Sequence, residues 1–288
     1  MTAIATSAWM PAPREAPRRL FAIGDVHGQS DLLHALHAHL EALLDAASPA
    51  GPPVDAPVDG PVLVHLGDYI DRGPDSLGAL RAALDWSHPR CEAVALPGNH
   101  EQIMLRFADT YQEDAKPERQ EDALALWVMN GGSEVCAELG IIDITDPAVV
   151  GVALTSRMTP LLERLRALPA AAFFPPYLFV HAGLPRGVAS RYVPPADVPG
   201  IDWRAERPGS AGFRGSRSPL WVREGFLDVM APWPDDTIVI HGHTIVRHGP
   251  DIRPNRIGLD LGAFKHGRLA MIELSGARMR FHLAQRSG

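Results

Sequence analysis

The sequence predicts an α/β protein in which two packed β-sheets carry helices on their outer faces. The N-terminal part alternates apolar strands with amphipathic helices, which is the pattern of strand–helix units. The C-terminal part is rich in expected strands, at 171–174, 177–180, 237–240, 257–261, 269–274 and 279–283. Three strand-to-helix turns also place Asp, His or Asn beside a glycine. These observations predict two sheets with polar side chains gathered at strand ends.

Each element of the N-terminal part has its own signal. Apolar strands are expected at Leu20–Ile23, Pro61–Leu66 and Glu92–Leu96, each followed by a glycine-containing turn. Helices are expected over Ser30–Ala46, Pro74–Trp86 and Ser156–Leu168 and from His100 onward. In the first of these helices, leucines recur at helical spacing and Ser30 or Asp31 can cap the first turn. The strand–helix order favours parallel strands in this part of the chain.

Two segments are expected to lie outside the regular elements. Residues 1–17 mix prolines and charges with small residues, and we expect a flexible N-terminal tail. Residues 48–61 are rich in proline and are expected to form a surface loop. This loop separates two motif-bearing units that must lie together, so residues 18–288 are expected to form one domain.

Composition excludes several classes of protein. The chain has 288 residues, of which 46% are hydrophobic, and a formal charge of −7. An acidic balance is not typical of nucleic-acid binders, and the chain has no run long and apolar enough for a membrane span. No secretory signal is expected, and two isolated cysteines are typical of buried residues in a reducing cytoplasm.

Six polar residues follow expected strands and lie within two residues of a glycine: Asp25, His27, Asp68, Asn99, His181 and His243. Ligands bind at the carboxyl ends of strands in open α/β sheets. Carboxylate and imidazole donors without thiolates suit Mn²⁺, Fe²⁺ or Zn²⁺. A carboxylate shared by two such ions would hold them roughly 3.5–4 Å apart and make hydroxide available from a shared water. The pattern therefore favours a two-metal hydrolase.

Other polar residues are open to more than one interpretation. Arg72 and Arg223 could hold a phosphoryl group, although Arg223 alone is also compatible with a surface salt bridge. His34, His37 and His39 lie on different faces of one helix, which favours a solvated surface over a metal site. His241 is more simply interpreted as a strand residue than as a partner of the neighbouring ligand. Asp260 suits a structural hydrogen bond as well as a chemical role.

Five motifs together resemble one family. GDVHG at 24–28, GDYIDRG at 67–73, GNHE at 98–101, HAG at 181–183 and GHT at 242–244 are similar to the phosphoprotein phosphatase family of calcineurin-like metallophosphoesterases. LWVMNGG at 126–132 and LWVRE at 220–224 resemble bacterial and phage serine/threonine phosphatases in particular. The resemblance implies a four-layer αββα sandwich with two mixed β-sheets and a dinuclear metal site between them.

The resemblance also implies a role for each site residue. Asp25, His27 and Asp68 would bind the first ion, and Asp68 would bridge to a second ion bound by Asn99, His181 and His243. His100 would be the general acid, oriented by Asp71 and kept protonated by that carboxylate. The phosphate would be held by Arg72, Arg223 and Asn99. Manganese is the expected metal, with iron or zinc as alternatives.

The substrate is expected to be a phosphorylated protein or a small phosphoester, hydrolysed by attack of the bridging hydroxide on phosphorus. The acid Glu101 in GNHE and Asp71 before Arg-Gly favour a serine/threonine phosphatase over a hydrolase of dinucleoside polyphosphates such as diadenosine tetraphosphate. A metal-binding scaffold without catalysis is a distant alternative. Nucleic acid and membrane are not expected as partners, and the Arg204–Arg217 loop is hypothesised to steer anionic phosphopeptides.

Overall fold

The computed structural model describes residues 2–46, 60–113, 115–184, 195–205 and 218–286. Its strands are β1 (Thr2–Thr6), β2 (Met10–Ile23), β3 (Val62–His65), β4 (Glu92–Ala95), β5 (Ala171–Phe174), β6 (Tyr177–Val180), β7 (Ile238–His241), β8 (Asp251–Arg253), β9 (Arg256–Gly258) and β10 (Arg268–Arg286). Its helices are α1 (Ser30–Ala46), α2 (Ser76–Asp85), α3 (Asn99–Gln112), α4 (Pro117–Trp127), α5 (Ser133–Glu138), α6 (Pro147–Arg166) and α7 (Ala263–His266). A π-helical turn, η1 (Val128–Gly132), follows α4, and a 3₁₀ helix, η3 (Pro195–Gly200), follows the second sheet's β6 in sequence.

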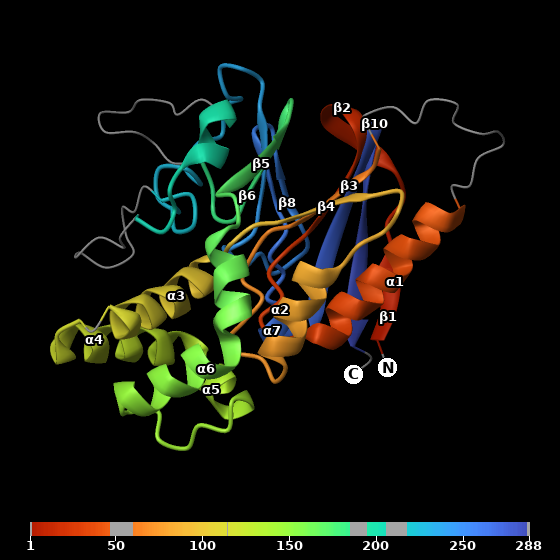
Figure 1. Ribbon diagram of the computed structural model, residues 1–288. Coiled ribbons are helices and arrows are strands. Elements are labelled where there is room, and N and C mark those ends of the chain that lie inside the picture. Colours follow the sequence, from red (N-terminus) through yellow and green to blue (C-terminus); the bar gives the residue numbers. More distant parts are fainter. Residues whose placement is uncertain (1, 47–59, 114, 185–194, 206–217, 287–288) are drawn as a thin grey trace.

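The strands form two mixed five-stranded sheets, which confirms the predicted fold class (Figure 1). The first sheet has the order β1-β10-β2-β3-β4, and the second has the order β5-β6-β7-β9-β8. In the first sheet β2, β3 and β4 are parallel, and in the second β6, β7 and β9 are parallel. In the first sheet β10 pairs antiparallel with β2, and in the second sheet the edge strands β5 and β8 pair antiparallel with β6 and β9.

Successive side chains of a strand point to opposite faces of its sheet, and this alternation divides the core into layers. In β2, Leu20 and Ala22 point into the apolar layer between the sheets, while Phe21 and Ile23 pack with the leucines of α1. Helices α1 and α2 lie over the outer face of the first sheet (Figure 1). The outer face of the second sheet packs on Val198 of η3 and on Phe226 and Trp233 from turn segments.

The strands end at one level, which positions the site. Ile23 pairs with His65, and His65 pairs with Ala95, so β2, β3 and β4 stop side by side. In the second sheet Val180 pairs with His241 in the same way. The turns that follow these strands therefore start at the same edge of each sheet.

The N-terminal tail prediction is wrong, because β1 and the first part of β2 lie in residues 1–17 and pair with β10. The pairing tolerates the prolines of β2 because the register shifts twice, on either side of Gly276. Trp9, between the two strands, lies under the guanidinium groups of Arg278 and Arg280, at 5.2 and 4.4 Å from the ring centre. The unexpected order of the tail thus follows from the length of β10.

Other boundaries also differ from the sequence-based expectation. The strands expected at 269–274 and 279–283 are one strand, β10, and the helix expected from Ser156 already begins at Pro147. The short strand β8 was not expected. Most of the proline-rich segment at 48–61 and most of the Arg204–Arg217 loop lie outside the described residues. Within the described parts of the chain, no helix is long and apolar enough to cross a membrane.

Candidate metal and phosphate site

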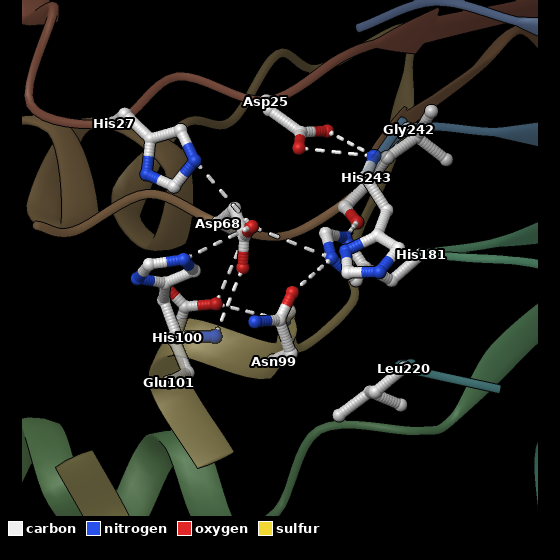
Figure 2. Close-up of polar contacts among 12 residues, drawn as sticks. Asp25, His27, Asp68, Asn99, His100, Glu101, His181, Leu220, Gly242 and His243 are labelled. Carbon is white, nitrogen blue, oxygen red and sulfur yellow. Dashed lines mark hydrogen bonds and ion pairs between the residues drawn. The ribbon is translucent and has the colours of Figure 1, made fainter. Parts of the chain in front are cut away.

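The turns after β2, β3, β4, β6 and β7 bring all six predicted ligand residues together (Figure 2). Each of the six side chains is buried, with at most 6% of its surface exposed: Asp25, His27, Asp68, Asn99, His181 and His243. They come from both sheets, so the group forms only when the two sheets pack. His100, on the first turn of α3, is buried beside them.

Asp68 lies at the centre of this group. Its Oδ2 is 3.5 Å from His27 Nε2, 3.4 Å from His181 Nε2 and 4.0 Å from His100 Nε2. Possible ligand atoms form two close groups that share Asp68, namely His27, Asp68 and His100, and Asp68, His181 and His243. A single carboxylate common to two groups of nitrogens is an arrangement that suits a pair of cations.

The other two predicted ligands lie against this centre through hydrogen bonds. Both carboxylate oxygens of Asp25 accept from the backbone N–H of His243 at 3.0 Å. Asn99 Oδ1 lies 3.0 Å from His181 Nε2. The sequence-based ligand sets put Asp25 with His27, whereas the close group around His27 contains His100.

The imidazoles are oriented as metal ligands require. His27 Nδ1 lies 2.9 Å from the Ile70 carbonyl, and His181 Nδ1 lies 2.8 Å from the Leu66 carbonyl. A carbonyl fixes the proton on Nδ1, so Nε2 is the nitrogen that faces Asp68 and that would bind a cation. His243 Nε2 is buried and has no hydrogen-bond partner among the described residues. Since a buried nitrogen without a partner is costly, this donor set fits divalent cations.

The backbone is held in an unusual conformation at the same place. Positive φ angles occur at His27 (46°), Asp68 (54°), Asp71 (70°), Arg72 (68°) and His243 (63°). Residues other than glycine adopt this region at a cost, and such strain concentrates at functional sites. The orientation of these side chains is therefore maintained at a cost in stability.

Glu101 holds the strained turn in place. Its fully buried carboxylate accepts from the backbone N–H groups of Gly98 at 2.7 Å, Asp68 at 2.9 Å, Tyr69 at 2.8 Å and Ile70 at 3.3 Å. These bonds tie the turn after β3 to the start of α3. The sequence pointed to Glu101 only as a sign of substrate class, and its position within the GNHE motif gives no hint of these long-range bonds.

The pKa values of the site residues are shifted in different directions. Burial alone would raise the pKa of Asp68, but His181 and His100 hold it well below its usual value. Burial alone would lower the pKa of His181, but the Asp68 carboxylate raises it to about 9. Burial and then Asp260 raise the pKa of Asp25 well above its usual value. The crowding of carboxylates indicates a site that gains from positive charge.

His100 and Asp71 form the predicted pair. His100 Nδ1 lies 2.7 Å from Asp71 Oδ2, and the indole Nε1 of Trp127 donates to Asp71 Oδ1 at 3.0 Å. Burial lowers the pKa of His100 to about 4 and raises the pKa of Asp71 well above its usual value. This direction for His100 is opposite to the sequence-based expectation, because burial outweighs the attraction of Asp68. The short contact nevertheless requires one proton between the two groups.

The two predicted phosphate-binding arginines lie at the mouth of the site, and both are exposed. Arg72 donates from Nη1 to His27 Nε2 at 3.0 Å, and its guanidinium lies 4.9 Å from the ring centre of Phe264. Arg223 donates from Nη2 to the His243 carbonyl at 3.2 Å. Neither forms an ion pair with any carboxylate of the described residues. The two guanidinium groups, which lie beside the predicted metal ligands, can therefore bind an anion.

His241, His37 and Asp260 have structural surroundings. His241 belongs to β7, its Nδ1 lies 2.9 Å from the Gly242 carbonyl, and its ring packs edge-on against Phe226. Asp260 accepts from the Gly262 backbone N–H at 2.8 Å. The prediction of a solvated surface is wrong for His37, which is buried against His65 with 2.8 Å between their Nε2 atoms.

Comparisons with known proteins identify the family of the chain. The family model for calcineurin-like phosphoesterases matches residues 18–265. The chain belongs to the calcineurin-like phosphoesterase family. Membership supports the prediction of a hydrolase of the metallophosphatase type.

The chain is 43% identical over 72 residues to serine/threonine-protein phosphatase 1 of Salmonella typhimurium. That match spans 25% of this chain and 26% of the relative. A protein serine/threonine phosphatase from Saccharomyces cerevisiae shares the fold, with 16% identity, a TM-score of 0.50, and coverage of 94% of this chain and 81% of that one. A proposed diadenosine tetraphosphatase has 18% identity, a TM-score of 0.49 and coverage of 97% of each chain.

Proposed function

We propose that the chain is a metal-dependent phosphomonoesterase that acts on phosphoserine or phosphothreonine in proteins. The observation that carries the proposal is the His100–Asp71 pair beside Asp68, with Arg72 and Arg223 at the mouth. A serine or threonine alkoxide is a poor leaving group, so its release requires a proton donor. Release of a nucleoside phosphate depends less on a proton donor, because phosphate is a better leaving group.

The donor set supports two divalent cations, of which manganese is the proposed metal. Asp25, His27 and Asp68 would hold one ion, and Asp68, Asn99, His181 and His243 would hold the other. When bound, such a pair supplies Lewis acidity, lowering the pKa of a water and neutralising charge on the phosphoryl oxygens. The unpartnered Nε2 of His243, together with the place of His243 in the close group of Asp68 and His181, is the feature that most directly supports this occupancy.

The protein groups divide the remaining work. Arg72 and Arg223 bind the phosphoryl oxygens and fix the orientation of the ester. His100 presents Nε2 toward the centre around Asp68 while Asp71 holds Nδ1. A proton on Nε2 would then be available to the leaving oxygen of an ester bound at this centre. A dianionic phosphoryl group close to His100 raises the pKa of its imidazole, which favours the protonated form when substrate binds.

The test compares a phosphoserine peptide with diadenosine tetraphosphate, using purified protein supplied with Mn²⁺. The account predicts a higher kcat/KM for the peptide, and a loss of about 10²–10⁴-fold in His100→Asn. A preference for the dinucleotide would retain the metal site and reject the proposed substrate class. Hydrolysis of neither substrate, with metal bound, would support the scaffold alternative.

A further inference from the structure

The segment Leu126–Gly132, where α4 passes into η1, reaches the site from outside both sheets. Trp127 is fully buried there, and its indole donates to Asp71 Oδ1 at 3.0 Å. The other oxygen, Oδ2, faces His100 Nδ1 at 2.7 Å. The two oxygens of Asp71 are thus divided between an indole and an imidazole. The backbone N–H of Asp71 donates to Ser76 Oγ at 3.0 Å.

The paired glycines of the same segment allow this close approach. A Cβ at Gly132 would lie 2.6 Å from the indole of Trp127, and a Cβ at Gly131 would lie 2.8 Å from Arg72 Cγ. Gly131 has a φ of 106°, and its carbonyl accepts from the Arg72 backbone N–H at 3.1 Å. One segment therefore contacts both the orienting carboxylate and the arginine beside it.

The indole restricts a rotation that matters for proton transfer. A carboxylate bonded only to His100 could turn about its terminal torsion, which is broad in aspartate. With Oδ1 fixed by Trp127, Oδ2 stays on His100 Nδ1, and Nε2 stays 4.0 Å from Asp68 Oδ2. The ring also stacks on Phe107 at 6.0 Å, so the indole itself is held by packing.

We propose that Trp127 is a positioning residue that orients His100 for protonation of the leaving oxygen, acting through Asp71. This inference rests on the proposed phosphomonoesterase function. As the water oxygen bonds to phosphorus, the electron pair of the breaking P–O bond goes to the alkoxide oxygen. That oxygen takes the proton from His100 Nε2. One proton of the attacking water stays on the phosphate and the other replaces the proton that His100 gave up, giving alcohol and hydrogen phosphate.

The test uses Trp127→Phe with two monoesters that differ in leaving group. p-Nitrophenolate leaves without help, whereas a serine alkoxide requires a proton, so loss of orientation affects the second far more. We expect kcat for a phosphoserine peptide to fall about tenfold more than kcat for p-nitrophenyl phosphate. Because both substrates are measured on one preparation, the ratio does not depend on the folded fraction.

Trp86→Phe is the matched control, because Trp86 also donates its indole N–H to a carboxylate, that of Glu41, at 3.2 Å. Its substrate ratio should equal that of the wild type. In an Asp71→Asn background, Trp127→Phe should change the ratio by less than about twofold, since the route through Asp71 is already lost.

An equal fall for both substrates in Trp127→Phe would overturn the inference and leave the proposed function standing. A full ratio change in the Asp71→Asn background would also overturn it. If the wild type hydrolyses neither monoester but cleaves diadenosine tetraphosphate, the proposed function fails first and the inference fails with it. The two failures are therefore distinguishable.

Discussion

Two groups of buried histidines lie on opposite sides of the first sheet's strand ends, and their surroundings differ. His37 and His65 contact each other between α1 and β3, and burial lowers their pKa values to about 2 and about 3. His181 is buried as deeply, yet Asp68 raises its pKa to about 9. The neighbouring Asp68 carboxylate, rather than the degree of burial, distinguishes His181 from this packed pair. Histidine burial alone therefore does not identify a site.

The largest expected effect comes from removing the shared carboxylate. Asp68→Asn keeps the size of the side chain but removes the charge common to both groups of nitrogens. We expect kcat for p-nitrophenyl phosphate to fall about 10³-fold or more. The matched variant His37→Phe alters the other histidine group and should keep its kcat. A similar loss of kcat in both variants would show that the difference between the two histidine groups does not bear on catalysis.

The carboxylate that supports the site backbone should have the next largest effect. Glu101→Gln replaces an acceptor of four backbone N–H groups with an amide that presents its own hydrogens to some of them. We expect the free energy of unfolding in urea to fall by about 3 kcal/mol.

Glu138→Gln is the control for this effect. Glu138 is half-buried and accepts from the backbone N–H groups of two residues, Ser76 and Leu77. Its change should cost about 1 kcal/mol, because water can reach the side chain. An unfolding midpoint unchanged by Glu101→Gln would contradict the role given to Glu101.

The His37–His65 pair should have a smaller effect, seen as a dependence of stability on pH. Both histidines stay neutral in the folded protein, while in the unfolded chain they take up protons below their usual pKa of 6.5. The unfolded state then binds more protons, so stability is present above pH 6.5 and is lost as pH falls toward 3. Each histidine contributes about 1.4 kcal/mol per pH unit within that window.

Urea unfolding at pH 7.5 and pH 5.0 measures this contribution. The wild type should lose more stability between the two values than the double variant His37→Leu, His65→Leu. The comparison uses the difference between the two pH values, so the altered packing of the variant largely cancels. Equal losses in the two proteins would show that this pair does not carry the dependence.

The ligand residues could be predicted because the rule behind them is local. Each follows an apolar strand and lies within two residues of a glycine, as Asp68 does after Gly67. The carboxyl ends of parallel strands share an edge, so residues such as Asp25 and Asp68 must meet without any knowledge of side-chain packing. The same rule predicted the strand–helix order of the first sheet.

The rest could not be predicted because it depends on contacts between distant segments. The bond from Trp127 to Asp71 joins residues 56 positions apart and depends on how η1 packs. His37 faces His65 only because α1 lies on that face of β3. The order of Thr2–Thr6 depends on β10, at the other end of the chain. Composition suggested a tail there, since local signals do not include a distant partner.

The most direct test of the central claim, that Asp68 is shared by two cation sites, is the metal content after dialysis against Mn²⁺. Mass spectrometry should find about two manganese ions per chain in the wild type and in His37→Phe, and at most about one in Asp68→Asn. Two ions retained by Asp68→Asn, or a wild type that binds only one, would contradict the claim.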